Sequence, residues 1–269
     1  MEVKRPKPRM VFGPLRIEQG ARMLPEEVAV ALSYNGTTQA VMMATPERLE
    51  EFAYGFSLTE GIAGPDEIES VEVVETDRGI DVQIWLADEA GARLARRRRT
   101  MAGPVGCGLC GIDSLEEATR TLPQVTASLA ITPQQICAAV AELPAHQGLH
   151  DATRAAHAAA FWTPGGGIVA ACEDVGRHNA LDKLAGTMLR RGIAPLGAVV
   201  LTSRVSIDMV QKCAAMGVPV LIAVSAPTAH AVEMAEAAGI TLIALARPDR
   251  FEAFTHTDRI HPDEAAHVA

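Results

Sequence analysis

Aromatic residues are scarce in this chain of 269 residues. They make up 4% of the sequence, whereas hydrophobic residues together make up 48%. The core must therefore rest on Ala, Val, Leu, Ile and Met, which are abundant enough for a globular rather than a disordered chain. The length suits one large domain or two modest ones.

Positively charged residues are also fewer than negatively charged ones. Lys and Arg number 24 against 33 Asp and Glu, which gives a formal net charge of −9. This balance argues against non-specific binding of nucleic acid or of a membrane by the whole surface. No apolar run approaches the length of a membrane span. The basic, proline-rich residues 1–9 lack the apolar segment of a signal peptide. We expect a cytoplasmic protein with no nucleic-acid or membrane partner.

Cysteine is rare, and only one pair is close in sequence. Cys107 and Cys110 lie among four glycines and a proline, a density that no helix or strand tolerates, so we expect a loop. Asp113 or Ser114 can cap a helix after it. A thiol near a helix N-terminus has a lowered pKa and is more reactive. The spacing alone supports three interpretations about equally: a metal site, a redox dithiol and a sulfur-carrying nucleophile. The remaining alternative is that the two cysteines have no function.

The sequence lacks the further motifs that some of these alternatives require. A structural zinc site usually needs a second cysteine pair, whereas Cys137, Cys172 and Cys213 stand singly, so no metal site is expected. A thioredoxin-type dithiol would lie near the start of a βαβ unit, but here an arginine run, residues 96–99, precedes the loop. A zinc deaminase needs His-x-Glu upstream of Pro-Cys-x-x-Cys, and the sequence has no such combination.

The first part of the chain predicts hairpins and a helix. Residues 28–44 form a hairpin pattern around Asn35-Gly36, because both turn positions favour positive φ. Thr45-Pro46 predicts the N-cap and first position of a helix that runs to about Thr59. Alternation over residues 66–86 predicts a second strand pair.

We therefore expect an N-terminal α+β domain with an antiparallel sheet over residues 1–98. The Ala- and Arg-rich residues 87–100 mark its end, and taken alone they are most simply a solvated helix face or a linker. A second domain, residues 99–269, carries the cysteine loop.

The second domain alternates helices and strands. Thr132-Pro133 opens a helix, and residues 155–162 and 168–172 predict a strand pair that contains His157, more often a structural residue than a ligand. Residues 198–246 predict βαβαβ with a parallel sheet. Ligands bind beyond the carboxyl ends of such strands. The candidate phosphate- or nucleotide-binding residues there are Ser203, Arg204, Ser225, Thr228, Arg247, Pro248, Asp249 and Arg250.

A polar segment, EDVGRHNALDK at residues 173–183, precedes a further helix. Its simplest interpretation is a helix cap with surface charges. Because Arg177 and His178 crowd one turn with other charged residues beside a buried strand, a functional patch is at least as well supported.

Together these segments resemble the formate dehydrogenase accessory sulfurtransferases, the FdhD/NarQ family. The resemblance is carried by Asn35-Gly36, Thr45-Pro46, the loop GCGLCG at 106–111, EDVGRHNALDK, Ser203-Arg204 and Ser225-Ala226-Pro227-Thr228. It implies a homodimer and a second domain with a cytidine deaminase-like, three-layer α/β fold.

The resemblance also implies the function. A member of this family accepts sulfur from a cysteine desulfurase, holds it as a persulfide, and passes it to the molybdenum of a bis-molybdopterin guanine dinucleotide cofactor. The sulfurated cofactor is then delivered to formate dehydrogenase. Cys107 matches the persulfide carrier, and Cys110 would assist. The cofactor-binding segment matches Leu245, Ala246 and residues 247–250, with Arg177 and His178 as further candidates. The alternative is a cofactor-binding chaperone whose cysteines carry no sulfur.

Overall fold

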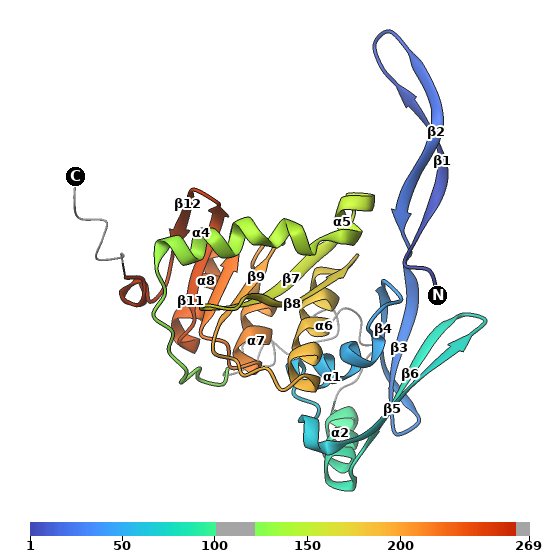
Figure 1. The fold of residues 1–269 in the computed structure, drawn as a ribbon. Coiled ribbons are helices and arrows are strands. Elements are labelled where there is room, and N and C mark those ends of the chain that lie inside the picture. Colours follow the sequence, from blue (N-terminus) through green and yellow to red (C-terminus); the bar gives the residue numbers. More distant parts are fainter. Residues whose placement is uncertain (101–121, 262–269) are drawn as a thin grey trace.

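The computed structural model describes residues 1–100 and 122–261 (Figure 1). Within them, the strands form a two-stranded ribbon, a four-stranded sheet and a six-stranded sheet. The mixed α/β class expected from the sequence is confirmed. None of the helices in this part of the chain is long and apolar enough to cross a membrane.

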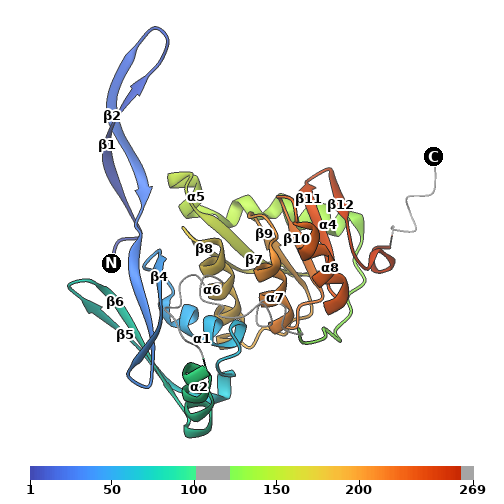
Figure 2. The same ribbon diagram turned by 180° about the vertical axis from the view of Figure 1, so that it is seen from behind.

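The chain begins with a ribbon that the sequence did not predict. β1 (Lys4–Phe12) and β2 (Ile17–Pro25) pair antiparallel with an unbroken register. The ribbon projects away from the rest of the molecule in both views (Figures 1 and 2). Pro6 and Pro8 obscure the strand pattern, because proline cannot donate to a sheet ladder and is confined to edge strands.

The four-stranded sheet has the order β4-β3-β6-β5. Both predicted hairpins are present, and Asn35 and Gly36 both have positive φ, as the first turn requires. The central pair, β3 with β6, is parallel, so the expectation of a wholly antiparallel sheet was wrong. Periodicity identifies strands but not their partners, and α1 returns the chain so that β6 lies beside β3 in the same direction. The elements are β3 (Val28–Tyr34), β4 (Thr37–Ala44), α1 (Leu49–Thr59), η1 (Pro65–Glu67), β5 (Ile68–Thr76), β6 (Gly79–Leu86) and α2 (Asp88–Thr100).

The predicted start of α1 needs correction. The helix begins at Leu49, preceded by Arg48 in the left-handed conformation, and Thr45 does not cap it. Thr45 is buried instead, where its backbone N–H donates to Asp174 and its hydroxyl accepts from the backbone N–H of Val175. Thr45 therefore bonds to residues that are distant in the sequence and does not cap α1 as the Thr-Pro pattern predicts.

The six-stranded sheet has the order β12-β11-β10-β9-β7-β8. The predicted antiparallel pair β7 and β8 is confirmed, and so is the parallel set β9, β10 and β11. An antiparallel edge strand, β12, was not predicted. The bounds are β7 (His157–Thr163), β8 (Gly167–Asp174), β9 (Ala198–Leu201), β10 (Val220–Ala223), β11 (Thr241–Arg247) and β12 (Arg250–Ala253).

Helices cover both faces of this sheet (Figures 1 and 2). α6, α7 and α8 pack on one face, with Phe161 and Leu201 in the core between them, and α4 packs on the other with Val200 and Ile222. Thr132 caps α4 as predicted, in a capping box with Gln135. The remaining elements are α4 (Pro133–Glu142), η2 (Leu143–His146), α5 (Gly148–Thr153), α6 (Arg177–Arg190), α7 (Ile207–Ala215), α8 (Ala229–Ala238) and η3 (Thr257–Arg259).

Two glycines let α1 and α6 cross at very short range. A Cβ on Gly55 would lie 1.7 Å from the carbonyl oxygen of Asp182, and one on Gly186 would lie 1.8 Å from that of Glu51. No side chain fits at either position unless the backbones separate. This crossing fixes the four-stranded sheet and its helix against the six-stranded sheet.

Buried ion pairs reinforce the crossing. Lys183 donates to Asp174 and to the carbonyl of Thr45, and all three residues are fully buried. Lys212 donates to Asp182 at 2.9 Å and to Glu60 at 2.8 Å.

These ion pairs give most of the charged residues in the polar segment 173–183 a structural role. Burial alone would lower the pKa of Lys212, but the carboxylates of Asp182 and Glu60 outweigh it and raise the pKa to about 12. Asp174, Asp182 and Lys183 therefore hold the two parts of the molecule together rather than forming an open patch.

Candidate functional site

A cavity of about 750 Å³ lies at the edge of the six-stranded sheet where its parallel strands end. Thr202, Val224 and Ala246, at the carboxyl ends of β9, β10 and β11, line one side of it, and Val175 follows the end of β8. Ligands of parallel α/β sheets bind at this edge. The cavity therefore lies where the sequence predicted a ligand.

The opposite wall comes from the α4, η2 and α5 layer, which contributes apolar surface through Val140, Leu143 and Pro144. Gln147 and His150 lie on the same wall. No sequence pattern predicts this wall, because its residues precede the strand ends in the chain and carry no motif. Only the packing of the helical layer over the sheet brings them to the site.

Basic side chains ring the cavity. His150, Arg154, His157 and Arg247 line it, and no Asp or Glu is among the described lining residues. The Arg247 guanidinium donates to the carbonyl of Val224 at 2.7 Å and to that of its neighbour Ala246 at 2.8 Å, which holds it at the rim. A cationic cavity with an apolar wall suits an anionic ligand that also carries a flat organic group.

His157 contributes a titratable imidazole to the cavity wall. Burial lowers its pKa below the usual value of 6.5, and the nearby charges of Arg177 and His150 lower it further. The imidazole is therefore neutral at pH 7 and gains a charge only in acid. The sequence favoured a structural role for this residue, and its position in the cavity wall makes it a candidate ligand contact as well.

The predicted binding residues divide into two groups. Ala246, Arg247 and Pro248 line the cavity. The others do not line it, because the chain turns away after each strand: Thr228 caps α8, Ser203 bonds to the carbonyl of Arg204, and Arg250 begins β12. The predicted residues outside the described lining are Leu245, Asp249, Arg250, Ser203, Arg204, Ser225, Thr228, Arg177 and His178.

Arg177 and His178 belong to a second polar cluster, at the start of α6. His178 Nε2 lies 3.0 Å from the carboxylate of Asp208, which also accepts from Ser206 at 3.2 Å. Burial, the largest single influence, would raise the pKa of Asp208, but the hydrogen bonds from His178 and Ser206 and the nearby charges of His178 and Arg177 together outweigh it, and the pKa is lowered. The second carboxylate oxygen of Asp208 and Nε of Arg177 are buried without a described partner.

Asp208 was missed from the sequence because a single acidic residue in a helix carries no signal. The predicted pair of Arg177 and His178 does lie together, but with Asp208 rather than in the lining of the cavity.

Three of the five cysteines can be compared directly. Cys172 and Cys213 are buried and Cys137 is partly buried. Burial raises the pKa of each thiol, to about 12 for Cys213, and Asp249 raises that of Cys137 further. All three stay protonated and unreactive at neutral pH. Cys107 and Cys110 lie outside the described residues.

The fold is shared with a solved protein. The crystal structure of a formate dehydrogenase accessory protein from Desulfotalea psychrophila superposes with a TM-score of 0.76 at 24% sequence identity, covering 97% of this chain and 100% of that one. At this level of identity the similarity defines the class of fold, a mixed α/β protein with several sheets.

Sequence comparison identifies the family. The FdhD/NarQ family model matches residues 25–261, so the chain belongs to that family. The protein named sulfur carrier protein FdhD from Agrobacterium fabrum is 55% identical over 244 residues, 90% of each chain. The protein of the same name from Brucella abortus is 55% identical over 246 residues, which cover 90% of this chain and 91% of the relative.

Proposed function

We propose that the protein is a sulfurtransferase that carries persulfide sulfur on Cys107. In this proposal, the sulfur passes to a bis-molybdopterin guanine dinucleotide for formate dehydrogenase. The observation that carries the proposal is the basic cavity at the strand ends, which suits the phosphates and flat rings of such a substrate. The family relatives named as sulfur carriers support the sulfur half of the proposal.

The state of the other cysteines supports the choice of carrier. Cys137, Cys172 and Cys213 have raised thiol pKa values, so they are poor nucleophiles at neutral pH. Cys107 and Cys110 remain, in a glycine-rich segment before a predicted helix.

The loading step follows thiol exchange chemistry. The Cys107 thiolate attacks the outer sulfur of a persulfide on the donor desulfurase. A new S–S bond forms at Cys107 while the donor's S–S bond breaks, and the donor cysteine leaves as a thiolate. No external oxidant is required, and Cys110 would assist the later release.

The cavity would hold the acceptor through its own side chains. Arg154 and Arg247 offer guanidinium donors to phosphate oxygens, and His150 adds a ring nitrogen. Val140 and Leu143 supply an apolar surface for a ring system.

A Cys107→Ala exchange separates this proposal from the chaperone alternative. In cells without their own carrier, we expect the variant to restore less than about one hundredth of wild-type formate dehydrogenase activity, because the nucleophile is lost. The purified variant should still bind guanosine diphosphate normally. Cys137→Ala is the matched control and should retain activity, since that thiol stays protonated. Wild-type activity in the Cys107 variant would leave the chaperone role as the better account.

A further inference from the structure

His178 and Asp208 lie at the starts of two helices, at one edge of the six-stranded sheet. α6 follows β8, α7 follows β9, and β7 lies between these two strands. The connections after β8 and β9 contribute Val175 and Thr202 to the cavity wall, and His157, which also lines the cavity, is the first residue of β7. The pair of His178 and Asp208 therefore lies beside the cavity.

The carboxylate of Asp208 determines which nitrogen of His178 carries the ring proton. The pKa of Asp208 is lowered, so the carboxylate is charged at neutral pH and can only accept a hydrogen bond. His178 Nε2, which lies 3.0 Å from Asp208 Oδ2, is therefore the donor. Ser206 donates to the same carboxylate oxygen at 3.2 Å and helps to hold it in place. In the neutral imidazole, the lone pair is then on Nδ1.

Nδ1 of His178 can accept a proton. Within residues 1–100 and 122–261 no group bonds to it, and 17% of the side chain is exposed. A histidine that is held by a carboxylate through one nitrogen, and is open at the other beside a ligand cavity, has the arrangement of a general base. Arg177, its neighbour in the chain, adds a positive charge that favours an anion formed here.

The other charged groups of this region do not compete for that role. Five elements contribute charged or titratable side chains: Asp208 from α7, Arg177 from α6, His157 from β7, Asp174 from β8 and His150 from α5. Asp174 is neutralised by its ion pair with Lys183. Asp208 is therefore the described carboxylate that acts directly on the imidazole of His178.

We propose that His178, held by Asp208 and Ser206, is the proton acceptor for the thiol of the loading step. This role rests on the proposed function, in which the reactants that lose a proton are thiols. Nδ1 takes the S–H proton, which leaves a thiolate and an imidazolium. The thiolate attacks the outer sulfur of the donor persulfide, and a new S–S bond forms while the donor's S–S bond breaks. The imidazolium then returns the proton to the donor thiolate. Asp208 and Ser206 are positioning residues.

The rate at which sulfur appears on the Cys107 peptide tests this role. It is followed between pH 6 and pH 9 by rapid quenching and mass spectrometry, with glutathione persulfide as the donor. His178→Gln should load about tenfold more slowly than the wild type at pH 7 and within about threefold of it at pH 9, where a thiol ionises unaided. Asp208→Asn should change the pH profile in the same direction, and the double variant should be no slower than His178→Gln.

His230→Gln is the matched control. His230 also lies 3.1 Å from a carboxylate, that of Glu233, but this pair is exposed and neither residue is in the described lining of the cavity. The control should load at the wild-type rate at every pH. Added imidazole should restore His178→Ala at pH 7 by at least about fivefold and leave the wild type and the control unchanged, which a merely structural role would not produce.

Two results would overturn the role of His178 while Cys107 remains the carrier. One is a His178→Gln variant that loads at the wild-type rate at every pH, and the other is a His178→Ala variant that imidazole does not restore. A wild type that takes up no sulfur on Cys107 would refute the proposed function and this role with it. If the variants fail to fold, nitrogen-15 NMR of the wild type decides: the neutral imidazole of His178 should carry its proton on Nε2, and a proton on Nδ1 would refute the role.

Discussion

At the scale of single residues, we expect His157 to make ligand binding sensitive to pH. Its pKa lies below 6.5 because of burial and the neighbouring charges of Arg177 and His150. An anion in the cavity favours the charged imidazole, so affinity for guanosine diphosphate should rise as the pH falls through this lowered pKa. We expect about a three- to tenfold gain between pH 7 and pH 5, measured by isothermal titration calorimetry.

His157→Gln keeps a polar side chain but cannot titrate, so its affinity should change less with pH than that of the wild type. A wild-type affinity that does not change with pH, or a glutamine variant that keeps the full dependence, would remove His157 from the binding site.

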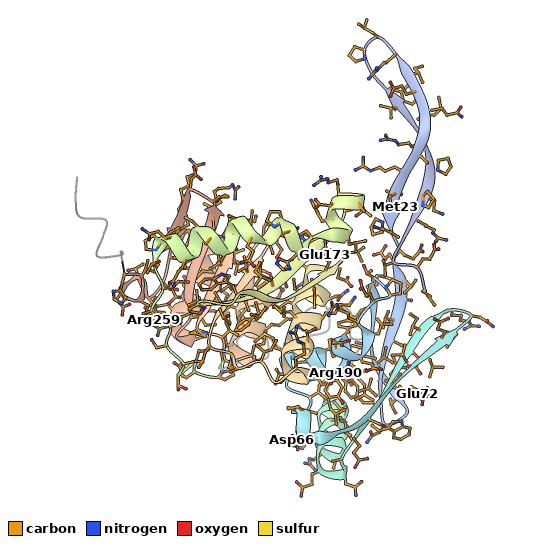
Figure 3. All side chains as sticks on the ribbon, viewed as in Figure 1. Met23, Asp66, Glu72, Glu173, Arg190 and Arg259 are labelled. Carbon is orange, nitrogen blue, oxygen red and sulfur yellow. The ribbon has the colours of Figure 1, made fainter. Side chains whose placement is uncertain are left out.

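For other residues, the sequence predicted a polar cluster but not the structural role that its members have. The sequence placed Asp174, Asp182 and Lys183 in a polar cluster beside a buried strand, and the structure puts all three in buried ion pairs. Figure 3 draws the side chains on the ribbon and labels Glu173, the first residue of this segment. Asp174 and Lys183 pair with each other and both bond to the backbone of Thr45, while Asp182 pairs with Lys212. Thr45 and Lys212 lie far from this segment in the sequence. A local pattern cannot indicate such pairings, because they depend on how α1 packs on α6.

At the scale of elements, the crossing of α1 and α6 depends on its glycines. A Gly55→Ala methyl group would overlap the carbonyl oxygen of Asp182, so the helices must separate and the ion pair of Asp182 with Lys212 must stretch. We expect a loss of about 2–4 kcal/mol in the free energy of unfolding, measured with urea.

Gly148→Ala is the matched control, because a Cβ there meets no atom within 4 Å. That variant should change the free energy of unfolding by less than about 1 kcal/mol. Equal stability of the two variants would mean that the helices tolerate separation and that the crossing is not a close contact in solution.

Element prediction worked where the signal was local. The Asn35-Gly36 turn, the capping box of Thr132 and the apolar strands β9 to β11 were all predictable, since turn chemistry, caps and buried strands each have a sequence pattern. β1 was missed because Pro6 and Pro8 interrupt its pattern. The parallel pairing of β3 with β6 was missed because strand partners are chosen by the path of the whole chain.

At the scale of the whole molecule, the site joins two layers. The strand ends that the sequence indicated form one wall of the cavity, and α4, η2 and α5 form the other. The general location was therefore predictable from the rule for parallel sheets. The contribution of Gln147, His150 and Arg154 was not predictable, because only tertiary packing brings these residues to the strand ends.

In the proposed function, sulfur is carried on Cys107. The most direct measurement is mass spectrometry of the protein after incubation with a cysteine desulfurase and cysteine, followed by digestion. We predict a mass increase of one sulfur atom on the peptide that contains Cys107, removed by a reductant and absent from the peptides of Cys137, Cys172 and Cys213. A Cys107 peptide that stays unmodified, or a sulfur found on one of the other three cysteines, would show that Cys107 is not the carrier.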